Sequence, residues 1–381
     1  MKILIAIPCL LSGGTEIQTI NLTKVLRSFG LRVNVLCYFE YDDRIVQKFR
    51  ETGCLVKLLG LNRRIFFISF LKTLKKEIRC IKPDIAHIQY MAPGALPIIA
   101  SRLARVKIVL TTVHQPYTKS HGRLAKLILR ATSKLTDRFI SVSRNTEHSW
   151  FGTSIIFDEK KKLNIQPHHF TIHNAIDTDK IRSIINNIDQ NSIKEILNIP
   201  DDRVIIGTVS RLRYEKGIDT LIEAFLQLTQ LQSNIHLLIV GGGPDEEMLQ
   251  KRVRESGISS QVTFLGTVDW ERAIELMSIM DIVVVPSRFE GFGLSAAEAM
   301  AAGKPVIASN TSGLKEVVSN NETGIFVPVD NSNALKNAMM KLISDPQLRN
   351  KLGNAGKTRV NENFSMEIFT KKIHALYNGI S

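Results

Sequence analysis

The fold is decided by residues 204–243, which read VIIGTVSRLRYEKGIDTLIEAFLQLTQLQSNIHLLIVGGG. An apolar run opens this stretch and another closes it, and neither shows the polar alternation of a half-exposed strand. Between the two runs, Leu221, Ile222 and Phe225 recur at the spacing of one helix face. The stretch therefore predicts two parallel strands joined by a crossover helix, in a sheet with helices on both faces.

The same alternation of apolar runs and amphipathic segments extends along the whole chain. Further strands are predicted at residues 2–10, 32–39, 84–90, 107–114, 137–143, 170–176, 262–268, 281–287 and 304–309. This order predicts an α/β fold with two doubly wound Rossmann-like domains facing across a cleft. We expect an N-terminal domain at residues 1–185 and a C-terminal domain at residues 200–363, linked through the polar stretch 181–200. The helical segment 364–381 is expected to pack back on the first domain.

Composition and charge restrict the class of protein. The chain has 381 residues, of which 44% are hydrophobic and 23% charged, which excludes a disordered chain, a collagen-like repeat and a coiled coil. Its apolar runs, such as residues 3–11, are shorter than the ~20 residues that span a bilayer. Residues 1–200 hold 31 Lys and Arg against 15 Asp and Glu, whereas residues 201–381 hold 19 against 21. The basic surface therefore belongs to one domain and suits a phosphate-rich ligand or an anionic membrane.

All 4 cysteines lie in the first 80 residues, without C-x-x-C pairing or a zinc-finger spacing. This pattern is typical of reduced thiols in a cytosolic protein. We therefore predict a cytoplasmic location.

Two loops that follow predicted strands carry groups that suit phosphate. The turn Ser12-Gly13-Gly14 precedes a helix whose N-terminal amides and dipole attract anions. The loop after residues 204–210 holds Arg211 and Lys216, a planar guanidinium and a compact ammonium that can close on one diphosphate. Each feature also occurs in ordinary surface turns, so neither defines a site alone.

The most informative stretch is PSRFEGFGLSAAEAMAAGKPVIAS, residues 286–309. Glu290 precedes the Gly291-Phe292-Gly293 loop, and Glu298 follows inside the predicted helix. The glycines let backbone amides approach a ligand, and carboxylates accept hydrogen bonds from sugar or ribose hydroxyls. Two carboxylates also fit a glycosidase acid–base pair, but a simple hydrolase has no use for the phosphate-binding groups nearby.

These motifs, in this order, resemble the family 4 retaining glycosyltransferases of the GT-B type over nearly the whole chain. The matching segments are Gly13-Gly14, TVHQ around His114, Arg211 with Lys216, Glu290 to Glu298, HNAID at 173–177, GLKEVV at 313–318 and ETGIFVP at 322–328. The resemblance implies transfer of a sugar from a nucleotide diphosphate donor to an acceptor hydroxyl, with retention of anomeric configuration. A UDP-sugar donor and a surface-polysaccharide or glycolipid acceptor are favoured.

The resemblance also implies a role for each matching residue. Catalytic roles fall to His114 near the reacting sugar, to Glu290, and to the cations that neutralise the leaving group, Arg211 and Lys216. Donor contacts are expected from the Gly14 amide at the β-phosphate, from the amides of Phe292, Gly293 and Leu294, and from Glu298 at the ribose. His87 and His173 occupy similar strand ends and are weaker candidates.

No cofactor and no metal are expected. Asp177-Thr178-Asp179 spells D-x-D, a metal signature of another glycosyltransferase architecture, but here it stands at a helix start, where Asp is a favoured cap. Two alternative functions stay open: a nucleotide-sugar epimerase of the same architecture, and a non-catalytic nucleotide-sugar-binding partner subunit.

One predicted helix has a strongly basic face. That face holds Lys119, Arg123, Lys126, Arg130, Lys134 and Arg138, and another face holds Leu124, Leu127, Ile128, Ala131 and Leu135. Residues 63–79 form a second basic, apolar-rich segment. Such helices predict peripheral association with the anionic inner face of the cytoplasmic membrane. The alternative packs the apolar face on the sheet and leaves the basic face in water. Nucleic acid is not an expected partner, because the basic stripes lack interleaved stacking aromatics.

Overall fold

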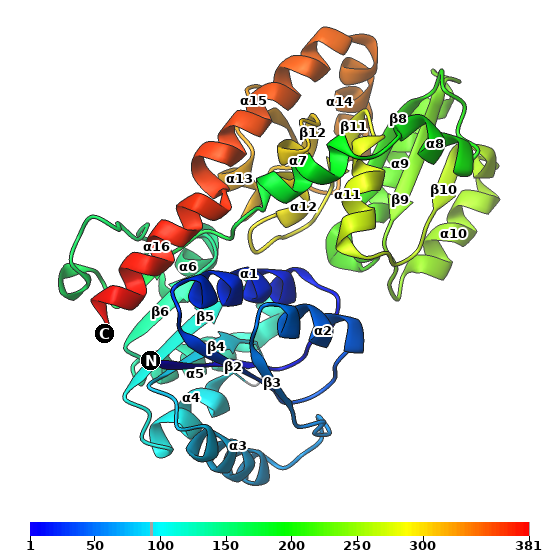
Figure 1. Cartoon of the computed structure of the whole chain (residues 1–381). Coiled ribbons are helices and arrows are strands. Elements are labelled where there is room, and N and C mark those ends of the chain that lie inside the picture. The colour runs from blue at the N-terminus through cyan, green and yellow to red at the C-terminus, as the bar shows by residue number, and fades with distance from the viewer. Residues whose placement is uncertain (92–93, 381) are drawn as a thin grey trace. The chain divides into compact units, whose positions relative to one another are not determined.

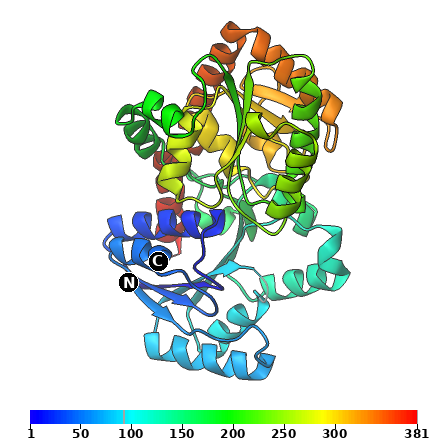
Figure 2. The same ribbon diagram turned by 90° about the vertical axis from the view of Figure 1, so that its right-hand side faces the viewer.

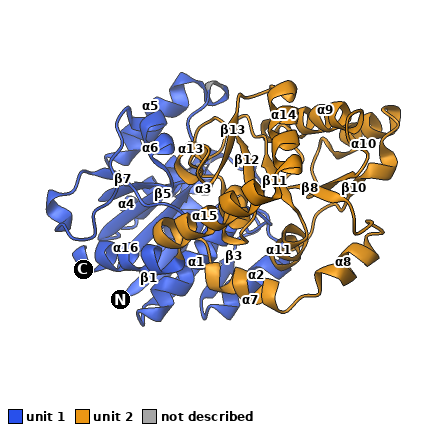
Figure 3. Cartoon of the chain, turned by 90° about the horizontal axis from the view of Figure 1, so that it is seen from above, with its two compact units in different colours: residues 1–175, 366–381 blue, residues 176–365 orange. Residues whose placement is uncertain are grey.

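The computed structural model describes residues 1–91 and 94–380, which form two compact units. Unit 1 comprises residues 1–175 and 366–381, and unit 2 comprises residues 176–365 (Figures 1 and 3). The cleft expected between the two units stays a prediction.

Unit 1 contains a sheet of parallel strands in the order β3-β2-β1-β4-β5-β6-β7. The strands are β1 (Lys2–Ile7), β2 (Arg32–Cys37), β3 (Leu55–Leu58), β4 (Ile85–Tyr90), β5 (Ile108–Val113), β6 (Arg138–Ser141) and β7 (His169–Thr171). The helices are α1 (Gly14–Ser28), α2 (Asp43–Glu51), α3 (Phe67–Ile81), α4 (Ala95–Leu103), α5 (Gly122–Ser133), α6 (Arg144–Phe151) and α16 (Met366–Gly379), with short 3-10 turns η1 (Lys119–His121) and η2 (Leu163–Ile165).

Alternate residues of β1 divide the core of unit 1 into two layers. Ile3, Ile5 and Ile7 pack with α1, α2 and the C-terminal helix α16. Leu4 and Ala6 point to the other face and pack with α3 and α4. This division follows from the two-residue period of a strand, and it explains why the strand reads as a continuous apolar run.

Unit 2 contains a parallel sheet in the order β10-β9-β8-β11-β12-β13. Its strands are β8 (Val204–Val209), β9 (Ile235–Val240), β10 (Val262–Phe264), β11 (Ile282–Val285), β12 (Val306–Ser309) and β13 (Gly324–Val327). Its helices are α7 (Thr178–Asn186), α8 (Gln190–Ile196), α9 (Ile218–Thr229), α10 (Glu246–Glu255), α11 (Trp270–Ser278), α12 (Leu294–Ala301), α13 (Leu314–Val317), α14 (Ser332–Ser344) and α15 (Pro346–Phe364), with 3-10 turns η3 (Tyr214–Lys216) and η4 (Ser259–Gln261). The α9, α10 and α14 layer packs on one face through a core that includes Ile206, Leu221, Phe225 and Leu335.

The stretch predicted as a linker is helical and belongs to unit 2. Residues 178–196 form α7 and α8, and α7 packs against α11 and α12. Ile181 and Ile193 are buried, whereas Asp177 and Asp189 cap the two helices. The predicted domain boundaries at residues 185 and 200 are therefore displaced: the division falls after Ala175, because two buried isoleucines outweigh the polar residues around them.

The chain crosses between the units twice, at neighbouring points. The amide of Ile176 donates to the carbonyl of Phe364 (2.7 Å) where the chain enters and leaves unit 2. After Ser365 the final helix α16 packs on α1 of unit 1, and its Tyr377 is buried there. No helix in the described part of the chain has the length and apolarity to span a bilayer.

Candidate active site

The sheet of unit 2 has a topological switch between β8 and β11. From β8 the chain continues to β9 and β10 on one side, and from β11 to β12 and β13 on the other. The loops that follow β8 and β11 therefore diverge, and in such sheets the ligand binds in the crevice between them. These loops are residues 210–217 and 286–293, which carry Arg211, Lys216 and Glu290.

The two loops are packed directly against each other. Gly217 has a positive φ of +64°, and a Cβ at this position would collide with the carbonyl oxygen of Pro286. The amide of Arg288 donates to the carbonyl of Glu215 (2.8 Å). The guanidinium of Arg288 bonds to Asp219 and stacks over the ring of Tyr214, 4.0 Å from its centroid. The positions of Lys216 and Glu290 are fixed by this framework.

Lys216 and Glu290 form an ion pair at the switch point. Lys216 Nζ lies 2.6 Å from Glu290 Oε1, and Ser287 Oγ donates to the same oxygen (2.9 Å). The backbone of Glu290 is held by a hydrogen bond from its amide to Ser312 Oγ (2.7 Å). Because an ammonium has three N–H donors, Lys216 can hold Glu290 and still donate to a phosphate oxygen. The pair thus positions a largely buried cation.

Glu298 lies in the second turn of α12, and its side chain is partly buried. Trp270 Nε1 donates to Glu298 Oε1 (2.7 Å), and Lys180 Nζ lies 5.1 Å from the centre of the Trp270 ring. Burial raises the pKa of the Glu298 carboxyl to about 7, although the Trp270 hydrogen bond acts in the opposite direction. A carboxylate that is costly to ionise without a ligand is suited to hydroxyl donors that satisfy its oxygens.

The loop between β11 and α12 ends at the N-terminus of α12, where backbone amides can donate to a ligand. Gly293 has a φ of +102°, and its carbonyl accepts the hydrogen bond of the Ala297 amide (3.1 Å). The amides of Leu294 and the two residues after it therefore have no acceptor within the helix, and they can donate to an anion. The side chain of Phe292 is buried and packs edge-on against Phe364, which anchors the loop.

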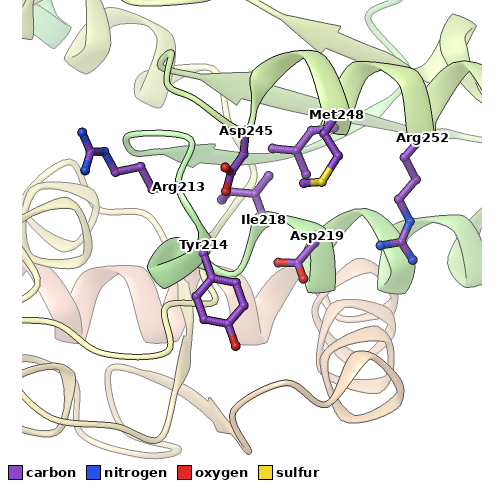
Figure 4. Close-up of a pocket in the computed structure, with 8 residues that line it drawn as sticks. Arg213, Tyr214, Ile218, Asp219, Asp245, Met248 and Arg252 are labelled. Atoms are coloured by element: carbon purple, nitrogen blue, oxygen red, sulfur yellow. The ribbon is translucent and has the colours of Figure 1, made fainter. Parts of the chain in front are cut away.

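Arg211 is exposed in the same loop as Lys216. A neighbouring pocket of about 230 Å³ lies between this loop, the start of α9 and α10, and Figure 4 shows Tyr214, Asp245 and Arg252 around it. Of the residues predicted for the site, none lines this pocket. It is a separate feature, whereas Lys216 and Glu290 meet at the switch between β8 and β11.

In unit 1, His114 follows β5 and is buried. Its Nε2 lies 2.7 Å from Oε1 of Gln89, a buried residue of β4. Burial lowers the pKa of His114 to about 4, so its ring is neutral at pH 7. His87 is bonded on both sides, to Tyr377 and Thr112 (each 2.7 Å), and therefore serves the core.

The other predicted positions of unit 1 and the D-x-D motif also have definite surroundings. Gly14 is the first residue of α1, and the carbonyl of Gly13 accepts from the amide of Ile17 (3.1 Å), so the Gly14 amide lies at a helix N-terminus. Asp177 caps α7 by accepting from the Lys180 amide (3.1 Å). Within the described residues, no group of three His, Cys, Asp or Glu side chains is placed to hold a metal ion.

Four residues that support the predicted site residues were not predicted from the sequence. Trp270, Ser287, Ser312 and Gln89 each bond to a predicted residue, yet none was predicted for the site, although Ser287 lies in the stretch 286–309. Gln89 also carried a signal: it is a polar residue inside the strand predicted at 84–90, and this strand pairs with the one that precedes His114.

Two family models match the chain. The one described as Glycosyl transferases group 1 matches residues 189–359, and the one described as Glycosyltransferase Family 4 matches residues 12–155. Together they account for most of the chain. The protein therefore belongs to the group 1 glycosyltransferases, and its N-terminal half carries the family 4 domain.

Individual relatives agree with this assignment. The capsular polysaccharide biosynthesis glycosyltransferase CapM of Staphylococcus aureus is 26% identical over 89% of this chain and 86% of its own length. Alpha-monoglucosyldiacylglycerol synthase of Acholeplasma laidlawii is 24% identical over 96% of this chain and 94% of its own. The chain spans only about half the length, 47%, of each of the first two curated relatives that it matches.

Among solved structures, Anabaena Alr3699/HepE in complex with UDP is similar with a TM-score of 0.81. The two are 20% identical, and the match covers 99% of this chain and 100% of that one. This likeness, with the two parallel sheets, confirms the predicted fold class of two Rossmann-like GT-B domains.

Proposed function

We propose that this protein transfers a sugar from a nucleotide diphosphate donor, with UDP-sugars favoured, to an acceptor hydroxyl, with retention of anomeric configuration. The observation that carries the proposal is the Lys216–Glu290 pair at the β8–β11 switch, beside the N-terminal amides of α12. Family membership supports the reaction class, and the UDP bound in the HepE structure supports the choice of nucleotide.

The chemistry follows from the charge that develops during the reaction. Cleavage of the bond between sugar and diphosphate places negative charge on the leaving oxygens. Lys216, Arg211 and the amides at the start of α12 stabilise that charge, and one preorganised donor of this kind contributes ~3 kcal/mol. Glu298 accepts from the ribose hydroxyls, and Glu290 accepts from the donor sugar while it holds Lys216. No metal is required, because cations and amides supply the charge.

We assign the expected roles to the residues of unit 1. The neutral His114 ring offers a lone pair to a sugar hydroxyl, and the Gly14 amide donates to the β-phosphate. The relatives CapM and the monoglucosyldiacylglycerol synthase support a surface-polysaccharide or glycolipid acceptor.

The test begins with a thermal-shift panel of UDP-, GDP- and ADP-sugars. A donor present at 100 Kd stabilises the protein by ~2.7 kcal/mol. The stabilising donor is then incubated with a lipid-linked acceptor, and the anomeric configuration of the product is read by proton NMR. Release of UDP with a retained anomer supports the proposal, and an inverted anomer contradicts it.

The same incubation separates the two alternatives. Conversion of the donor sugar without acceptor indicates an epimerase. Binding without turnover, with acceptor present, indicates a non-catalytic partner subunit.

A further inference from the structure

Helix α5 of unit 1 exposes its apolar face, whereas an ordinary surface helix buries that face. Leu124 and Leu127 are 69% and 64% exposed, and Ile128 and Leu135 are exposed as well. The residues that α5 buries are Leu129, Thr132 and Ser133. The alternative in which the apolar face packs on the sheet is therefore wrong, because that face points to solvent. We call Leu124, Leu127, Ile128 and Leu135 the α5 patch.

The orientation of α5 is fixed by its cations. Lys126 Nζ donates to the carbonyl of Ser149 (2.6 Å) and lies 4.9 Å from the centre of the Tyr117 ring. Arg130 Nε donates to the carbonyl of Trp150 (2.7 Å). Two of the basic side chains are thus used to attach α5 to α6 and to the segment before η1. The leucines are left outside, and Figure 2 shows α5, in teal, on the outside of unit 1.

A second group of exposed apolar side chains lies in the same helical layer. Phe66, Phe67 and Ile68, at the start of α3, are 83%, 63% and 53% exposed. α3 packs against α4, and α4 packs against α5, on one side of the sheet. In parallel α/β units each helix begins at the edge where the strands end. The Phe66–Ile68 group and the part of the α5 patch near the start of α5, Leu124 and Leu127, therefore lie toward the edge where this fold binds its ligands, whereas Leu135 follows the end of α5.

The charge around the α5 patch identifies the chemistry of its partner. Unit 1 holds 30 Lys and Arg against 12 Asp and Glu. Between Asp84 and Asp137 the sequence has 8 Lys and Arg and no acidic residue. Arg123 and Lys134 flank the patch and are exposed. A second copy of this face would set like charges against each other, which is unfavourable. An anionic bilayer supplies both an apolar interior and a negative surface.

We propose that the α5 patch, with the Phe66–Ile68 group, inserts into the interface of an anionic lipid bilayer while Arg123 and Lys134 contact lipid phosphates. This inference rests on the proposed function in one respect: it gives a lipid-linked acceptor its meeting place with unit 1. Binding to the bilayer itself requires no donor, so it is measured without nucleotide sugar.

The test is co-sedimentation of the full chain with vesicles of phosphatidylcholine and phosphatidylglycerol, and with phosphatidylcholine alone. We expect binding to the anionic vesicles that falls as salt is raised. Leu124→Ser with Leu127→Ser should weaken it by about tenfold or more. The matched control is Leu231→Ser with Ile196→Ser, two residues of unit 2 that are 60% and 70% exposed. This control should bind as the wild type does.

A second measurement reports insertion directly. Leu127→Cys in a Cys80→Ser background places an environment-sensitive dye at the patch, because Cys80 is exposed whereas Cys9, Cys37 and Cys54 are buried. We expect a blue shift on addition of anionic vesicles, and no shift for the same dye at Ile196→Cys.

Three results would overturn the proposal. The first is the absence of vesicle binding at low ionic strength. The second is equal vesicle binding by the wild type and the Leu124→Ser, Leu127→Ser variant. The third is self-association of the wild type that this variant abolishes. Vesicle binding without any sugar transfer would leave the proposal standing and count against the proposed function instead.

Discussion

Glu298→Gln is expected to stabilise the fold and to weaken donor binding. The Glu298 carboxyl is buried beside Trp270, and its pKa is raised from the ordinary value of 4.5 to about 7. Above pH 7 the carboxyl is ionised in both folded and unfolded chains, and the folded chain bears the whole cost. At 1.36 kcal/mol per pH unit, the difference between the two values corresponds to about 3 kcal/mol.

The stability gained by Glu298→Gln depends on pH, because the cost arises only when the carboxyl of Glu298 is ionised. The cost is absent below pH 4.5, where the carboxyl is neutral in both states, and grows until about pH 7. The amide of Gln has no charge to bury, and its oxygen still accepts from Trp270 Nε1. Urea unfolding should therefore show a variant up to about 3 kcal/mol more stable than wild type at pH 8, and the gain should vanish near pH 4.

The functional half of the prediction uses calorimetric titration with UDP. A neutral amide is a weaker acceptor than a carboxylate for the ribose hydroxyls, so affinity should fall by roughly tenfold. A variant with unchanged or lower stability at pH 8 would refute the reasoning about burial. Unchanged UDP affinity would refute the ribose contact.

Three further predictions concern neighbouring residues. Lys216→Ala should lower kcat by roughly 10² or more with the circular dichroism spectrum unchanged, whereas near wild-type turnover would remove the leaving-group role. Trp270→Phe removes the hydrogen bond that lowers the pKa of Glu298, so UDP binding should shift to higher pH in calorimetry; an unshifted profile would count against that bond. Gln89→Glu places a carboxylate at Nε2 of His114 and should raise the pKa of that ring, so activity should fall as pH drops below 7, unlike the wild type. A pH–rate profile identical to that of the wild type would show that Gln89 does not control His114.

Most strands of unit 2, and the loops that carry its candidate site residues, could be predicted because they rest on local patterns. Glu290, Gly293 and Glu298 stand on a loop and helix whose start at Leu294 is confirmed. The edge strands β3 and β13 were missed, since four residues with partly exposed side chains give too little periodicity. The strand predicted at 170–176 is confirmed only in part, as β7 ends at Thr171 and lies in the sheet of unit 1.

Other features depend on tertiary packing that no local pattern encodes. The amphipathic pattern of α5 was found, but the sequence left two orientations open, because hydrogen bonds from Lys126 and Arg130 to distant carbonyls decide between them. Trp270 supports Glu298 from another helix, 28 positions away in the sequence. The pairing of Lys216 with Glu290 likewise joins loops 74 positions apart.

The most direct measurement is the affinity of UDP for the wild-type chain and for Lys216→Met, by calorimetry at pH 7.5. If the ammonium at the β8–β11 switch holds the diphosphate, the variant should bind UDP at least about tenfold more weakly, while uridine, which lacks phosphates, binds both equally. Equal affinity of UDP for the two chains would contradict the account.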